Sequence, residues 1–235
     1  MEIIILKISP YKEKDGIVDA ISEEGHMSFL LRGVFDPKNK NAALNNPLTI
    51  AEVELAESKY KYPIIKSSMV LVNPINLHYD LSYMAVIMMI TEATLVMLNE
   101  EEKPLIYQRL TNTIKELKEG ISPLKIAVSY ISRILQISGY DFQVNECVKC
   151  GSKKNIATFS FNDGGFICSN CYTPDVPILF NKNQMLAIRE SFNSEDTHLL
   201  NDEITDEEII FLLHKLFEFI YDSFNYKMKS ADLFK

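Results

Sequence analysis

Apolar and polar positions alternate along the first 72 residues with the period of two that is typical of half-buried β-strands. In one run Ala51, Val53 and Leu55 alternate with Glu52 and Glu54, so one face of the strand is apolar and the other is polar. Five short strands of this kind fit a small barrel, for which an OB-fold is a common solution and an SH3-like barrel a similar one. The predicted strands are Glu2–Ile8, Gly16–Ser22, Met27–Val34, Leu48–Glu57 and Ile64–Val72.

Beyond Asn73-Pro74 the apolar positions take the spacing of helices. The most apolar run, 81–98, is near the length of a membrane span, but it contains Glu92, so we interpret it as a core helix. Its positions at helical spacing are Leu81, Met84, Ala85, Met88 and Leu95. Further helices are predicted from Pro104, from Ser122-Pro123 to Gly139, from Asn181, and after a capping box at 205–208.

Four cysteines, the only ones in the chain, stand as two CxxC pairs separated by seventeen residues. This spacing is typical of a zinc ribbon, because each pair aims two sulfurs at one point and a hairpin with an Asp-Gly-Gly turn at 163–165 returns the second pair to the first. We therefore predict one structural zinc ion on Cys147, Cys150, Cys168 and Cys171. Two disulfides, a redox CxxC or an iron–sulfur cluster would use the same residues.

Together these patterns predict an α+β chain: an N-terminal OB-fold β barrel followed by a helical bundle that a four-cysteine zinc ribbon interrupts. The predicted domains are 1–75 for the barrel and 76–235 for the helical part, with the ribbon at about 144–175. The N-terminus lacks the features of a signal peptide, so we expect a cytoplasmic protein. No Gly-rich phosphate loop or nucleophile motif is present, and we expect neither an enzyme nor a small-molecule substrate.

The net charge of −8 is unusual for a protein that binds nucleic acid, but one segment accounts for the whole excess of negative charge. The segment 190–208 contains eight acidic residues and no Lys or Arg, so the rest of the chain is formally neutral and can present a basic face. Two segments of the barrel combine cations or rings in the way nucleic-acid sites do. The candidate DNA-binding residues are Arg32, Lys38 and Lys40 after the third strand, and Lys59, Tyr60 and Lys61 between the fourth and fifth. The alternatives are a solvated loop and an ordinary hairpin bend.

Three stretches of the sequence are more specific than the cysteine spacing alone. They are SPYKEKDGIVDAISEEGHMSFLLRGV in the barrel, ISRILQISGYDFQVNECVKCG continuing to FSFNDGGFICSNC around the cysteines, and the closing KMKSADLF. Together and in this order, they resemble the RecO family of bacterial recombination mediators. The chain departs from the family in the segment RGVFDPKNKN, where Asp36 stands among positions at which many relatives have basic residues.

The resemblance implies an OB-fold that binds single- and double-stranded DNA. It also implies a nucleoid-associated protein that acts in DNA repair, in the response to DNA damage and in the SOS response. It implies strand annealing and, with RecR, loading of RecA on strands coated by single-stranded DNA-binding protein (SSB). The acidic, Phe-ended SSB tail needs an apolar pocket and cations. The helical region offers Lys103, Arg109, Lys115, Lys118, Lys125 and Arg133. The alternative function is a zinc-stabilised adaptor that binds proteins and has no affinity for DNA.

Overall fold

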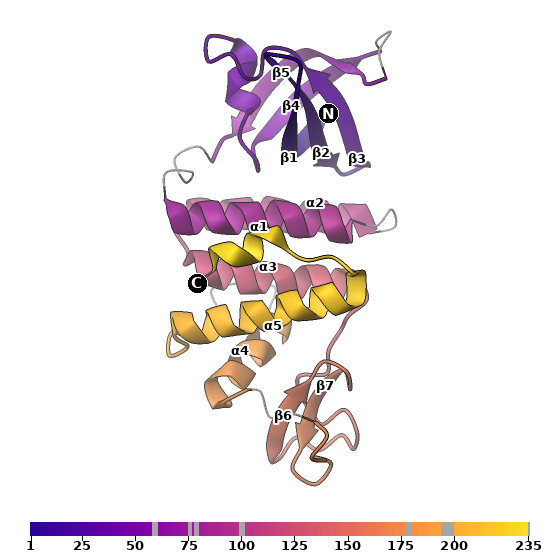
Figure 1. Cartoon of the computed structure of the whole chain (residues 1–235), viewed down its shortest axis with the longest axis vertical. Helices are drawn as coiled ribbons and strands as arrows, with labels where there is room; N and C mark the ends of the chain where they lie inside the picture. Colours follow the sequence, from indigo (N-terminus) through magenta and orange to yellow (C-terminus); the bar gives the residue numbers. More distant parts are fainter. Residues whose placement is uncertain are drawn as a thin grey trace. The chain divides into compact units, whose positions relative to one another are not determined.

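The computed structural model describes residues 1–57, 61–74, 77, 80–98, 102–176, 180–193 and 200–234. The chain forms two compact units, Met1–Gly120 and Ile121–Lys235 (Figure 1). The first contains the predicted barrel and two helices, and the second contains the remaining helices and the four cysteines. The α+β prediction is confirmed. The division at residue 75 between barrel and helical domain stays a prediction.

A closed five-stranded barrel with the order β1-β2-β3-β5-β4 forms the first part of unit one. Antiparallel pairs join most neighbours, and the single parallel pair Leu30↔Ile64 closes β3 on β5. The barrel closes around side chains such as Ile5, Phe29 and Val53, which are almost completely buried, and Leu44 fills it from a short 3-10 helix. The elements are β1 (Glu2–Tyr11), β2 (Asp15–Ser22), β3 (Gly25–Leu31), η1 (Lys40–Leu44), β4 (Ile50–Ala56) and β5 (Ile64–Val72).

Two helices pack on one end of this barrel: α1 (Leu81–Met97) contacts β1, and α2 (Lys103–Lys118) contacts β1, β2 and β3. The hydroxyl of Tyr107 on α2 donates to Glu2 at the start of β1, over 2.6 Å. Burial is the main reason why the pKa of Tyr107 is raised well above its ordinary value, and the hydrogen bond to Glu2 is the second reason. The helices therefore cover the end at which β1 begins.

The residues of α1 that stand at helical spacing are buried to different extents. Leu81 is 79% exposed and Met88 50% exposed, whereas the neighbouring Val86, Met89 and Ile90 are buried. Helix α1 is apolar on nearly all sides, so helical spacing by itself could not identify the face that packs. The predicted helix is present, but Leu81 and Met88 of the spaced set lie outside its buried face, whereas Ala85 is part of it.

The second unit packs three long helices with a two-stranded hairpin. Helix α3 contacts α4 and α5, and α4 contacts α5. The predicted capping box is present at Thr205 and Glu208, whose side chains each bond the other's backbone N–H. The elements are α3 (Pro123–Ile137), β6 (Ile156–Ser160), β7 (Gly165–Cys168), α4 (Lys182–Asn193), α5 (Asp206–Phe224) and η5 (Lys229–Leu233). Within the described ranges, no helix has both the length and the hydropathy that a membrane crossing requires.

Candidate metal centre and basic barrel end

The sulfur atoms of Cys147, Cys150, Cys168 and Cys171 all lie within 4.8 Å of one another. The Cys150 and Cys168 sulfurs are 3.7 Å apart. Four thiolates around one zinc ion at about 2.3 Å would be separated by about 3.8 Å, so the spacing suits a tetrahedral metal site. The sequence prediction that these residues meet is confirmed, and the group can hold a metal ion.

Each CxxC pair forms a similar tight turn. In the first, the N–H of Gly151 donates to the carbonyl of Cys147 over 2.8 Å, and in the second the N–H of Tyr172 donates to Cys168 over 2.9 Å. Gly151 has a φ of +71°, which the turn requires and which glycine adopts without strain. These turns direct the two sulfurs of each pair toward one point.

The chemistry of the four thiols favours a cation between them. Burial opposes ionisation of Cys147, but backbone N–H donors of Cys168, Lys149 and Cys150 outweigh it and lower the pKa of Cys147 to about 6. Hydrogen bonding to Cys150, followed by burial and the other two thiols, raises the pKa of Cys171 to about 12. Four thiols this close do not all ionise together by themselves, because the thiolates would repel one another. A bound divalent cation offsets this repulsion.

The hairpin between the cysteine pairs is anchored by a third extended segment. The N–H of Phe166 donates to the carbonyl of Gln143, and the N–H of Gln143 donates to the carbonyl of Gly164, each over 2.9 Å. A Cβ on Gly165 would lie 2.3 Å from the carbonyl oxygen of Gln143, so only glycine fits there. The predicted hairpin is therefore present, with a close backbone contact that the Asp-Gly-Gly motif did not disclose.

An aromatic network ties this hairpin to the helices of the same unit. The rings of Phe161, in the hairpin turn, and Phe219, on α5, are stacked at 5.1 Å and 20°. Phe142 makes edge-on contacts with Phe159 at 5.4 Å and with Phe192, on α4, at 5.2 Å. The sequence analysis missed this network. The clustering of Phe around the cysteines was the available signal, because apolar rings beside a zinc ribbon need a surface to cover them.

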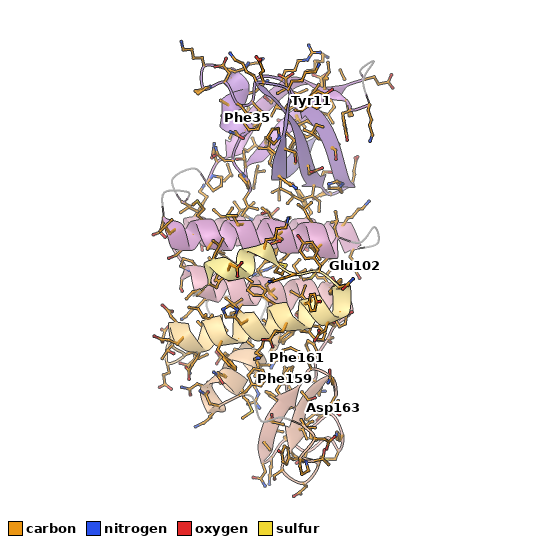
Figure 2. All side chains as sticks on the ribbon, viewed as in Figure 1. Tyr11, Phe35, Glu102, Phe159, Phe161 and Asp163 are labelled. Carbon is orange, nitrogen blue, oxygen red and sulfur yellow. The ribbon has the colours of Figure 1, made fainter. Side chains whose placement is uncertain are left out.

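The second candidate region is the end of the barrel where β1 ends. The register pairs Tyr11 with Asp15 and Gly16 with Leu31, and Ile64 pairs with both Leu30 and Ala56. The β1–β2 turn, the segment after β3 and the β4–β5 connection therefore leave the barrel at one end, opposite the helices of the first unit. Figure 2 shows Tyr11 and Phe35 at this end.

This register brings together cations that are distant in sequence. Arg32, Lys38, Lys40 and Lys61 are exposed, and their side chains form no ion pair with any residue that the structure describes. Lys61 lies over the ring of Tyr62, with its Nζ 5.4 Å from the ring centroid. Lys59 and Tyr60 lie outside the described residues.

Asp36, the acidic residue in the basic segment, is engaged by a cation from the neighbouring turn. Lys14 Nζ lies 2.8 Å from Asp36 Oδ2, and the backbone N–H of Lys38 donates to Asp36 Oδ1 over 3.1 Å. Both hydrogen bonds hold the pKa of Asp36 below its ordinary value, and the bond from Lys14 has the larger effect. The pair fastens the segment to the β1–β2 turn and places Lys14 beside the cations of this end.

Two cations considered for an acidic tail have other partners. Arg109 is buried and bonds Glu116, at 3.1 and 3.3 Å, and Lys125 bonds Asp202 and the carbonyl of Leu200. Lys115 lines a surface hollow with Tyr107 and Gln108, and in unit two Arg133 lines another with Gln136 and Asp141. Lys115 and Lys118 are exposed, whereas Lys103 and Arg133 are half-buried and have interactions of their own.

Comparison with known proteins gives two matches to family models. "Recombination protein O N terminal" matches residues 1–70, and "Recombination protein O C terminal" matches residues 78–222. The chain is 25% identical to the DNA repair protein RecO of Bacillus subtilis (strain 168) over 229 residues, covering 94% of this chain and 88% of the relative. It is 28% identical to the DNA repair protein RecO of Thermoanaerobacter sp. (strain X514) over 173 residues, covering 72% and 69%. No catalytic family is among these matches.

Proposed function

Since this chain belongs to the RecO family of DNA repair and recombination proteins, we propose that it is a non-enzymatic recombination mediator that works by binding DNA and protein partners. It binds single- and double-stranded DNA, promotes annealing of complementary strands and, with RecR, promotes RecA loading on SSB-coated DNA. Its place of action is the cytoplasm, at the nucleoid. The observation that carries the proposal is the succession of the two family models along one chain.

DNA binds at the basic end of the barrel. Arg32, Lys38 and Lys40 supply cations for phosphates, and the β4–β5 connection adds Lys61 with Tyr62 and, by sequence, Lys59 and Tyr60. Support comes from the register, which brings the connecting segments to one end, and from the absence of ion pairs on these four described cations. Exposed cations beside rings suit a strand whose phosphates and bases are both accessible.

One zinc ion is held by Cys147, Cys150, Cys168 and Cys171 and stabilises the hairpin. The sulfur spacing, the all-cysteine donor set and the absence of a non-thiolate ligand among the described candidates support a closed structural site. An iron–sulfur cluster is the competing occupant, and elemental analysis distinguishes the two.

The acidic tail of SSB binds at one of the candidate cations of the helical region, Lys103, Lys115, Lys118 or Arg133. The carboxylates of such a tail need cations that can reach them, which favours the exposed Lys115 and Lys118 over Arg109 and Lys125. A fluorescent tail peptide tests this. Binding should weaken with salt and be lost when the terminal Phe is removed, and an absence of binding at low salt overturns it.

Annealing of two complementary oligonucleotides, followed by fluorescence quenching, tests the proposed function. The purified protein should accelerate annealing, and the acceleration should fall steeply with salt, because each phosphate contact releases counterions. The alternative, a zinc-stabilised adaptor that binds only proteins, predicts the same annealing rate with and without the protein. That result, with a folded and zinc-loaded sample, would reject the mediator function.

A further inference from the structure

A hollow of about 490 Å³ lies on the second unit between the last turns of α5 and the C-terminal segment. Its lining includes the apolar residues Phe217 and Met228, which are only 5% and 2% exposed. Tyr221 forms part of the wall with its side chain 52% exposed. A concave surface lined by apolar residues and a half-exposed ring is the shape that a large apolar side chain fits.

The walls of this hollow are held in place by the C-terminal segment. A ring nitrogen of His214, on α5, lies 2.8 Å from the carbonyl oxygen of Phe234. The ring of Phe234 packs against that of Phe217, with their centroids 5.9 Å apart. Because these contacts fix η5 against α5, the hollow is preformed, and a ligand need not order the segment to use it.

The charge around the hollow is of one predominant sign. Asp222 and Asp232 line it, are exposed, and form no ion pair with any described residue. Glu218 also lines it but is paired with Lys215 at 2.7 Å. Lys227 is the one Lys or Arg among the described lining residues.

The end of α5 adds to this negative field. Asp222 lies in the last turn of the helix, where the unpaired carbonyl groups already carry partial negative charge, and that turn contains no basic residue. A carboxylate at a helix C-terminus is unfavourable, and a cation placed beside it relieves the repulsion. The site therefore places two carboxylates and a helix C-terminus beside an apolar depression.

We propose that this hollow is a docking site for a protein segment that inserts a large apolar side chain flanked by lysine or arginine. The carboxylates would repel both DNA phosphates and an acidic tail, so the site differs from those under the proposed function. The inference concerns another surface and does not depend on DNA binding by the barrel.

Methyl NMR of the full chain with labelled methionine tests the proposal, because Met228 lines the hollow. The probe is a short peptide of lysines around a central phenylalanine. We expect it to shift the Met228 resonance saturably and to leave Met69, in the barrel, unchanged. A peptide with alanine in place of the phenylalanine, and one with glutamates in place of the lysines, should produce little shift.

Charge-reversal variants locate the site. Asp222→Lys with Asp232→Lys should weaken binding of the basic peptide about tenfold, as expected for two exposed carboxylates. Glu203→Lys, which reverses one exposed charge elsewhere in the same unit, is the control and should leave binding unchanged. If the acidic peptide shifts Met228 more than the basic one, or if no peptide shifts it at millimolar concentration, the proposal is wrong.

Discussion

The sulfur atoms of Cys150 and Cys168 lie 3.7 Å apart although the two residues are eighteen positions apart in the chain. One belongs to the turn before the hairpin and the other to the end of β7. The turns, the β6–β7 pairing and the contact with Gln143 bring these atoms to a distance that a tetrahedral thiolate site requires. The backbone of the ribbon is thus organised around one point.

We expect purified protein to contain about one zinc ion per chain. Removing it with a chelator should reduce the thermal stability of the second unit, since binding energy at a structural site is folding energy. Elemental analysis and thermal unfolding with and without chelator measure both effects. An iron chromophore, or unchanged unfolding after all metal has been removed, would contradict the assignment.

Gly165→Ala should destabilise the ribbon more than Gly164→Ala. Both glycines have positive φ, at +156° and +81°, but a Cβ at Gly165 would meet the backbone of Gln143 and one at Gly164 would meet nothing within 4 Å. We expect Gly165→Ala to cost at least about 1 kcal/mol more in the free energy of unfolding. Chemical denaturation of the two variants gives the comparison, and equal losses would mean that the Gln143 contact is unimportant.

Phe161→Ala should weaken both the second unit and its hold on the metal. The stacked contact with Phe219 joins the hairpin to α5, so its loss should lower the free energy of unfolding by about 2 kcal/mol. It should also speed zinc transfer to a colorimetric chelator. Leu233→Ala, which truncates a side chain that is 48% exposed, is the control for both measurements. Zinc transfer at the wild-type rate would show that the ribbon holds its metal independently of the aromatic network.

The sequence was sufficient to predict the barrel and the cysteine cluster because both have short-range periodic signals. Alternation predicted β5 at its observed bounds, and CxxC spacing predicted that all four cysteines meet. The packing face of α1 could not be predicted, since a helix that is apolar on all sides carries no directional signal. The Lys14–Asp36 pair and the stacking of Phe161 on Phe219 join distant segments, and only the folded register brings them together.

Asp36→Asn should increase affinity for single-stranded DNA several-fold, because it removes a negative charge from the basic segment and releases Lys14. Mild acidification will not mimic it. The pKa of Asp36 lies below its ordinary value, so the carboxylate stays ionised, and its stabilising contribution is lost only when the pH falls below the usual aspartate range. Fluorescence anisotropy with a labelled oligonucleotide at neutral pH and near pH 5 checks both statements. An unchanged or lower affinity would count against DNA binding at this segment.

A salt titration of single-stranded DNA binding tests the proposed function most directly. It compares the wild type with a variant in which Arg32, Lys38 and Lys40 are all replaced by Ala. The wild type should bind at low salt with a steep salt dependence, and the variant should bind more weakly on every sequence. Its slope should be flatter by up to roughly 2, at about 0.7 for each lost phosphate contact. The control replaces Lys153, Lys154 and Lys182, which are exposed in the second unit, and should retain the wild-type slope. A wild type with no measurable binding at low salt would contradict the mediator function, and a triple variant with unchanged affinity and slope would contradict its placement at the barrel end.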